Sequence, residues 1–166
     1  MKAGTRREVS IHIAASPEEV YGLVSDVRRM GEWSPECRHA EWIGDATGPV
    51  VGARFRAANR RGVARWSNSP RVVAADAGRE FAFVAGYFGR EMTKWTYRFL
   101  PAAGGTEVAE SFEMLQDRPW YLALSSATLM GVQDRAADLE AGMTETLRRL
   151  KAAVESNPPG AGSPNG

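Results

Sequence analysis

The chain has 166 residues, of which 43% are hydrophobic and 25% are charged, a composition typical of a globular protein with a single domain. Its formal net charge of +1 provides no overall electrostatic field that would collect nucleic acid or an anionic membrane. The single cysteine, Cys37, excludes an internal disulfide. No apolar run approaches the roughly 20 residues that span a bilayer, and the N-terminus lacks the apolar core of a secretory signal. We therefore expect a cytoplasmic protein without stable membrane insertion.

The N-terminal part predicts a strand followed by two short helices. Residues 1–7 are polar, and we expect them to be flexible. Apolar and polar residues alternate over 8–15, which predicts a strand. Ser16 and Glu19 form a capping box around a proline, so a helix is expected to begin there. A second short helix is expected at 28–33.

The middle of the chain has the alternation of antiparallel strands. Turns that contain glycine separate short segments in which apolar residues recur at every second position. Pro70, inside the third of these segments, indicates a bulge or an edge position, because proline cannot donate a hydrogen bond to a neighbouring strand. The expected strands are residues 37–44, 53–60, 63–75, 80–86, 91–100 and 106–115.

After Pro119 the apolar period becomes helical. Residues 120–130 are apolar on nearly every side, which is compatible with a lid over a cavity, a membrane contact, a dimer interface or ordinary packing. Residues 133–155 carry one apolar stripe and predict a long final helix. Residues 156–166 contain proline, glycine and small polar residues, so we expect a disordered tail. The elements together predict an α+β fold with six to seven antiparallel strands.

Glu110 departs from the alternation of the last expected strand, because it lies on the apolar face between Val108 and Phe112. A buried carboxyl group needs polar partners, so this position favours a cavity over a filled core. Desolvation would raise the pKa of Glu110, which makes it a weak candidate for a general acid or base. The alternatives are an ion pair with an arginine or a position near the wet end of the sheet.

Aromatic and amide side chains share the inward parity of Glu110. A concave surface that mixes these groups is suited to orienting an aromatic or polyketide-like ligand. Trp33, at the end of the second short helix, is expected to guard the entrance of the cavity. The candidate ligand-binding residues are Trp33, Phe55, Asn59, Trp66, Asn68, Phe83, Trp95, Tyr97, Glu110, Phe112 and Met143.

We expect neither a metal nor another cofactor. Cys37 and His39 lie two residues apart, hence on one face of an expected strand, and could supply two metal ligands. A zinc site needs three or four ligands, however, and the other histidine, His12, has outward parity. The chain contains no nucleophile elbow, phosphate-binding loop or dinucleotide fingerprint.

An arginine cluster surrounds one expected hairpin, and its alternation favours a solvated outer face over a nucleic-acid site, so no nucleic-acid partner is expected. The arginines of this cluster are Arg54, Arg56, Arg60, Arg61 and Arg65.

The order of the expected elements resembles that of the START-like helix-grip superfamily, also called SRPBCC or polyketide cyclase/dehydrase-like. The stretch EVSIHIAASPEEVYGLVSDVRRMGEWSPE is similar to the first strand, capped helix and Trp-x-Pro turn of that superfamily. VGARFRAANRRG resembles its glycine-led strand, and GGTEVAESFEM resembles the strand before its final helix. The similarity covers residues 8–155 as one domain and is greatest to small bacterial, particularly actinobacterial, members.

The resemblance implies a curved antiparallel sheet wrapped around the long C-terminal helix, with a cavity between them for a hydrophobic small molecule. The superfamily includes lipid carriers, hormone receptors, aromatase/cyclases and proteins that protect antibiotic producers, so the fold leaves the function open. We favour a carrier, sequestering or protective protein, because no nucleophile, metal-ligand set or acid–base pair is evident. The alternative is a polyketide cyclase or aromatase without metal or nucleotide, in which Glu110 transfers protons. A monomer and a homodimer are both compatible with the sequence.

Overall fold

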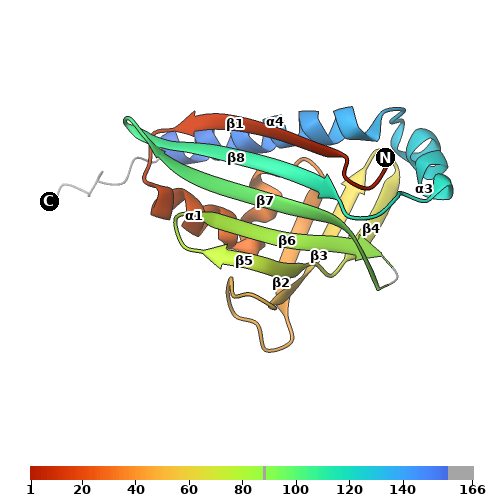
Figure 1. Cartoon of the computed structure of the whole chain (residues 1–166), viewed down its shortest axis with the longest axis horizontal. Helices are drawn as coiled ribbons and strands as arrows, with labels where there is room; N and C mark the ends of the chain where they lie inside the picture. Colours follow the sequence, from red (N-terminus) through yellow and green to blue (C-terminus); the bar gives the residue numbers. More distant parts are fainter. Residues whose placement is uncertain (88, 157–166) are drawn as a thin grey trace, which may run out of the picture.

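The computed structural model describes residues 1–87 and 89–156. Its main feature is a curved antiparallel sheet (Figure 1). Seven strands follow the order β1-β8-β7-β6-β5-β3-β2, and β4 pairs with β3 outside this path. The expected disordered tail lies outside the described residues except for Ser156. The strands are β1 (Arg6–Ile13), β2 (Cys37–Ile43), β3 (Arg54–Arg61), β4 (Ala64–Asn68), β5 (Arg71–Asp76), β6 (Glu80–Tyr87), β7 (Arg90–Ala102) and β8 (Gly105–Met114).

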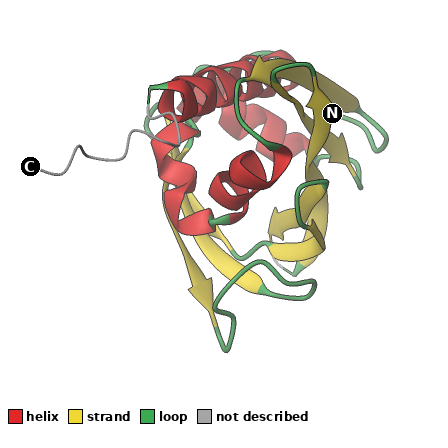
Figure 2. Cartoon of the chain, turned by 90° about the vertical axis from the view of Figure 1, so that its left-hand side faces the viewer, coloured by secondary structure: helices red, strands yellow, loops and turns green. Residues whose placement is uncertain are grey.

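The helices lie within the curve of this sheet (Figure 2). The longest helix, α4, runs alongside β1 and β8, so it covers one end of the sheet path. This arrangement confirms the expected α+β helix-grip fold with two short helices after the first strand. The helices are α1 (Pro17–Ser25), the 3-10 helix η1 (Val27–Arg29), α2 (Met30–Trp33), α3 (Trp120–Ser125), the π-helical turn η2 (Ser126–Met130) and α4 (Arg135–Glu155).

The beginning of α1 confirms the predicted capping box. The Ser16 hydroxyl accepts a hydrogen bond from the Glu19 backbone N–H at 3.3 Å, and the Glu19 carboxylate accepts one from the Ser16 N–H at 2.9 Å. At the start of α4, the Asp134 carboxylate accepts from the N–H groups of Ala136 and Ala137. Both helices therefore begin where side-chain oxygens satisfy the first free backbone donors.

The register of β7 and β8 brings the inward side chains together. Tyr97 lies directly opposite Glu110, and Trp95 lies directly opposite Phe112. Directly opposed residues project from the same face of a sheet, so these four side chains share one face. Glu110 therefore lies in the apolar register that the alternation of the sequence predicts.

The segment 63–75 forms two strands instead of the single strand that we expected. β4 ends at Asn68 and β5 begins at Arg71, with Pro70 between them. The Pro70 carbonyl accepts a hydrogen bond from the Phe55 N–H at 3.1 Å, although the proline itself has no N–H to donate. β4 pairs with the second half of β3, whereas β5 pairs with the start of β3 and with β6. The break at Pro70 therefore separates β4 from the main path of the sheet.

The N-terminal segment is joined to the end of β8, whereas its composition favoured a flexible segment. The first strand begins at Arg6, before the expected residue 8. The Gly4 N–H donates to the Met114 carbonyl at 2.8 Å, and the Met114 N–H donates to the Thr5 carbonyl at 2.9 Å. These hydrogen bonds extend the β1–β8 pairing toward the N-terminus.

The buried apolar side chains form two clusters. The larger cluster includes Phe55, Phe81 and Phe99 and packs under α1, and the smaller one includes Phe112 and Met143 and packs under the first half of α4. No helix within residues 1–87 and 89–156 is long and apolar enough to cross a membrane.

Candidate functional site

A cavity of about 380 Å³ lies between the sheet and α4, bordered by residues of both apolar clusters. Its volume is within the range of about 300 to 1,000 Å³ that is usual for small-molecule sites. From the helix, Leu139, Gly142, Met143 and Thr146 line it. The residues that the sequence proposed and that do line this cavity are Phe55, Asn59, Trp66, Asn68, Phe83, Trp95, Tyr97, Glu110 and Met143.

Two proposed residues, Trp33 and Phe112, do not line the cavity. Trp33 is buried in the larger core cluster, and the Arg29 guanidinium lies over its ring at 5.3 Å, so it does not guard an entrance. Phe112 is fully buried and packs against the Trp95 ring with 5.8 Å between the ring centroids. Phe112 therefore supports a wall residue of the cavity.

Glu110 is a buried carboxyl group with one hydrogen-bond partner among the described residues. The Tyr97 hydroxyl donates to its Oε1 at 2.7 Å, and its Oε2 has no such partner. Burial raises the pKa of Glu110 to about 8, and the hydrogen bond from Tyr97 offsets this only in part. An ion pair between Glu110 and an arginine was one expected alternative. The partner of Glu110 in the structure is instead the Tyr97 hydroxyl group. At neutral pH this carboxyl group is mostly protonated.

Asn68, which lines the cavity, carries a second unpartnered oxygen. Its Oδ1 is buried and has no hydrogen-bond partner within the described part of the chain. The neighbouring amide of Asn59 differs, because its Nδ2 donates to the Ala57 carbonyl at 3.3 Å. Buried polar atoms are costly unless they are hydrogen-bonded, so Asn68 and Glu110 mark places where a bound molecule would supply polar groups.

Cys37 lines the cavity, but its surroundings do not activate the thiol. Burial raises its pKa to about 11, and its Sγ donates to the His39 carbonyl at 3.6 Å. The register shifts between these two residues, and the His39 side chain is exposed. The expected placement of both on one face is therefore wrong. Among residues 1–87 and 89–156, no group of three or more His, Cys, Asp or Glu side chains is arranged to hold a metal ion.

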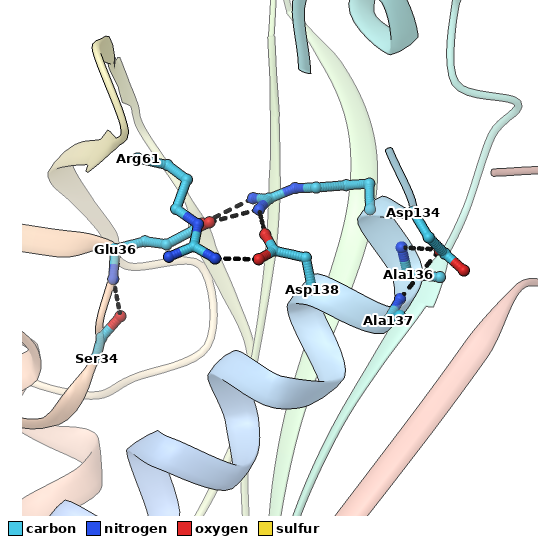
Figure 3. Close-up of polar contacts among 8 residues, drawn as sticks. Ser34, Glu36, Arg61, Asp134, Ala136, Ala137 and Asp138 are labelled. Atoms are coloured by element: carbon cyan, nitrogen blue, oxygen red, sulfur yellow. Dashed lines mark hydrogen bonds and ion pairs between the residues drawn. The ribbon is translucent and has the colours of Figure 1, made fainter. Parts of the chain in front are cut away.

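A network of partly buried ion pairs lines the cavity beside the start of α4 (Figure 3). The Arg135 guanidinium donates to the two carboxylate oxygens of Glu36 at 2.5 and 2.8 Å. It also pairs with Asp138, which in turn accepts a hydrogen bond from Arg61. This network connects the segment before β2, the end of β3 and the first turn of α4.

Sequence reasoning did not find this charged network. Glu36 and Arg135 are separated by 99 residues, and no local pattern relates them. Arg61 belongs to the arginine cluster that we expected on an outer face, yet it turns toward α4 and lines the cavity. Arg61 has the opposite strand parity to Arg60, so the alternation of the sequence could have indicated that the Arg61 side chain lies on the inward face. The other members, Arg54, Arg56, Arg60 and Arg65, are exposed.

The segment 120–130 borders the cavity near this network. It consists of α3 and η2, and Leu122 and Met130 line the cavity. The Leu129 carbonyl accepts a hydrogen bond from the Val63 N–H at 3.2 Å, which joins the segment to the β3–β4 turn. Trp120 is 77% exposed, so the segment has an apolar outer surface as well as an inner one.

Residues 5–155 match the model of a protein family described as "Polyketide cyclase / dehydrase and lipid transport". The chain belongs to this family. The polyketide-cyclase-like protein Cgl2372 from Corynebacterium glutamicum is similar at 32% identity and a TM-score of 0.62, over 93% of this chain and 94% of that one. Members of this family share the helix-grip fold described above.

More distant solved structures share the fold alone. The di-domain aromatase/cyclase StfQ from the steffimycin biosynthetic pathway has a TM-score of 0.70 at 14% identity, over 91% of this chain and 50% of that one. DynU16, a putative protein of the dynemicin biosynthetic locus, has a TM-score of 0.62 at 19% identity, over 91% of this chain and 47% of that one. No curated protein matches the chain significantly.

Proposed function

We propose that the protein binds a hydrophobic, aromatic or polyketide-like small molecule in the cavity and acts as a carrier, sequestering or protective protein. The observation that carries this proposal is the pair of unpartnered polar atoms, Glu110 Oε2 and Asn68 Oδ1, on residues that line the cavity beside the aromatic side chains of Phe55, Trp66 and Trp95. A few convergent polar groups in an apolar wall are the usual arrangement of a small-molecule site. The ligand therefore carries oxygen substituents on an apolar skeleton.

The protonation state of Glu110 defines the hydrogen bonds that it offers. Tyr97 donates to Oε1, so the proton of the neutral carboxyl group is on Oε2. Glu110 therefore donates to a carbonyl or hydroxyl oxygen of the ligand. Asn68 Oδ1 accepts from a hydroxyl group. A molecule that carries both a carbonyl and a hydroxyl group satisfies both positions.

The apolar part of the wall favours a planar ligand. The rings of Phe55 and Phe83 contact each other edge-to-face with centroids 5.3 Å apart, and Trp66 and Trp95 line the same cavity. Aromatic rings prefer offset-stacked or edge-to-face contacts with other rings. These side chains therefore suit an aromatic skeleton better than a flexible aliphatic chain.

A second candidate function, cyclase or aromatase chemistry, is favoured by the pKa of Glu110. A carboxyl group with a pKa of about 8 can give and take a proton near neutral pH, as a general acid or base must. Binding remains the leading proposal because Cys37 is a buried thiol with a raised pKa and lacks a paired base.

The experiment that tests the leading proposal measures the binding of the neutral dye N-phenyl-1-naphthylamine to the folded protein. We expect stoichiometric binding, which Trp95→Ala and Met143→Ala weaken, whereas the control Arg56→Ala leaves it unchanged because Arg56 lies outside the cavity and pairs with Glu41. Native mass spectrometry of protein purified from its own host then identifies a co-purifying molecule. Absent dye binding, or binding that is indifferent to all three substitutions, would overturn the proposal.

Glu110→Gln distinguishes the two candidate functions. Glutamine keeps the shape and the hydrogen bond from Tyr97 but cannot transfer a proton. Binding alone predicts that the affinity for the co-purifying molecule stays within about tenfold. Cyclase chemistry predicts similar affinity but a turnover that falls by about a hundredfold or more.

A further inference from the structure

Methionine supplies most of the long aliphatic side chains in the wall of the cavity. The chain contains six methionines, and all six line the cavity. Two leucines, Leu122 and Leu139, also line it, whereas no valine or isoleucine within the described part of the chain does so. The larger core cluster is built differently, because its buried aliphatic side chains are mainly valines, such as Val20, Val72 and Val108. The cavity-lining methionines are Met1, Met30, Met92, Met114, Met130 and Met143.

These methionines reach the cavity from different elements of the fold. Met92 lies on β7, Met114 ends β8, and Met143 lies within α4. These three side chains are buried and belong to the smaller core cluster. Met30 begins α2, and Met130 ends η2. Methionine therefore borders the cavity both from the sheet and from the helices.

A wall of methionines differs mechanically from a wall of valines or isoleucines. Methionine is unbranched and has three rotatable side-chain bonds, so it fills irregular spaces and adapts to its neighbours. Valine and isoleucine are stiff about their first side-chain bond, so they define a fixed shape. Surfaces that bind several partners use flexible, methionine-rich side chains because these can repack around each partner. The methionine wall can therefore adjust to molecules of different outline.

The part of the cavity around Glu110 is fixed by comparison. Tyr97 belongs to the larger core cluster, and its hydroxyl holds the Glu110 carboxyl group at 2.7 Å. Phe55 and Phe83 belong to the same cluster and contact each other edge-to-face. Trp95 packs against both clusters and so lies between this part and the methionines. The cavity thus combines a polar and aromatic part of defined shape with an aliphatic part that can deform.

We propose that the cavity binds a class of related ligands, which share the oxygenated group that meets Glu110 and differ in the outline of the apolar skeleton that lies against Met92, Met114 and Met143. This inference rests on the proposed binding function and adds the breadth of the ligand class. A site for one compound would gain from stiff side chains that define a single shape, because methionine specifies shape poorly. The protein then carries or sequesters a group of compounds.

Two neutral fluorescent ketones test this inference, because each offers a carbonyl oxygen to Glu110 on a skeleton of different outline. In 6-propionyl-2-dimethylaminonaphthalene the skeleton has two fused rings, and in 3-methoxybenzanthrone it has four. Dissociation constants are measured at neutral pH with the full chain. We expect the two constants of the wild type to lie within about tenfold of each other.

A triple variant stiffens the wall at nearly constant volume. It combines Met92→Ile and Met114→Ile, because isoleucine suits strands, with Met143→Leu, because leucine is a good helix former. A stiff wall fits one outline better than the other, so the ratio of the two constants should shift by about fivefold or more. The matched control is Leu139→Met, which changes the same wall in the opposite direction and should shift the ratio by less than about fivefold.

The outcomes separate this inference from the proposed function. If N-phenyl-1-naphthylamine binds, three results would overturn the inference and leave the binding function standing: a wild-type ratio above about tenfold, no binding of either ketone, or a smaller shift in the triple variant than about fivefold. An equal loss of affinity for both ketones counts as no shift. If the triple variant does not fold, Met114→Ile alone should shift the ratio by about threefold or more, and a smaller shift overturns the inference. If none of the three molecules binds, the binding function itself fails, and the inference fails with it.

Discussion

Tyr97 and Glu110 face each other across β7 and β8, and the tyrosine hydroxyl donates a hydrogen bond of 2.7 Å to the carboxyl group. Both side chains are buried in the cavity wall. Burial disfavours the ionised carboxylate more strongly than the single hydrogen bond stabilises it, so the pKa of Glu110 rises to about 8. Glu110 is therefore neutral in the folded protein over a pH range in which it is ionised in the unfolded chain.

The first prediction concerns the pH dependence of stability in Glu110→Gln. Between pH 4.5 and about 8, folded Glu110 retains a proton that the unfolded chain releases. The unfolding free energy of the wild type therefore falls with rising pH, by about 1.4 kcal/mol per unit from this group. Glutamine does not titrate, so the variant should become the more stable form by about 3 kcal/mol at pH 7. Urea unfolding at several pH values measures this difference.

The matched control for this prediction is Glu113→Gln, because Glu113 lies on the same strand but is exposed. Because an exposed side chain contributes little to stability, this substitution should change the unfolding free energy by less than about 0.5 kcal/mol. A difference between the wild type and Glu110→Gln that is constant with pH would show that Glu110 is ionised in the folded state.

The second prediction concerns Tyr97→Phe. The substitution removes the hydrogen bond to Glu110 Oε1, which leaves that oxygen without its partner, and should cost about 1 to 3 kcal/mol of stability. Because the bond from Tyr97 lowers the pKa of Glu110, its loss should raise that pKa further above about 8. Carbon-13 NMR titration of labelled glutamate carboxyl groups measures the change. An unaltered pKa would mean that the hydrogen bond does not form in solution.

The third prediction compares two arginines in ion pairs. Arg135 is largely buried against Glu36 and Asp138, so Arg135→Met leaves two shielded carboxylates without their shared partner and should cost about 3 to 5 kcal/mol. Arg148 pairs with Glu145 but has a side chain that is 64% exposed, so Arg148→Met should change stability far less than Arg135→Met does. Urea or thermal unfolding measures the loss of stability in each variant. Similar losses in both variants would contradict the view that the ion pairs of Arg135 are shielded from water.

The fourth prediction compares two glycines. A Cβ atom at Gly142, inside α4, would meet only the Pro35 ring at an ordinary distance of 3.6 Å. Gly142→Ala should therefore stabilise the protein by about 0.5 to 1 kcal/mol through helix propensity. A Cβ atom at Gly31 would lie 3.0 Å from the Arg38 carbonyl oxygen, so Gly31→Ala should destabilise the protein. Destabilisation by Gly142→Ala would indicate that α4 lies closer to Pro35 than the structure shows.

Local patterns were sufficient to predict most of the helices and strands, whereas the curved arrangement of the sheet around the C-terminal helix was implied by the resemblance to a known superfamily. The capping box at Ser16 marked the start of α1, and the alternation of apolar residues placed Tyr97 and Glu110 on the same face. Strand parity also identified the wall residues Asn59 and Asn68, because the period of two holds throughout a regular strand. These signals concern residues that are near in sequence or that follow one regular geometry.

Most of the missed or incorrectly placed site residues lie where regular geometry ends, although Phe112 lies within the regular strand β8. Trp33 lies at the end of a short helix, where no parity indicates whether a side chain enters the core or the cavity. Arg118 and Arg135 lie on either side of α3 and η2, and only the path of that segment brings both to the cavity. Glu36 and Arg135 are 99 residues apart in the sequence, so no local pattern indicates that they are in contact.

The pairing of β1 with β8 has a consequence for how the protein forms during its synthesis. Residues Arg6–Ile13 pair with residues that the ribosome adds roughly a hundred positions later, and α4 follows only after those. Until then, β1 lacks both its partner strand and the helix that covers it, and such apolar surface is open to aggregation or to chaperones. Because β8 and α4 are synthesised after the other walls, the cavity is complete only once α4 has been added, so a bound molecule cannot act as a template for the earlier strands.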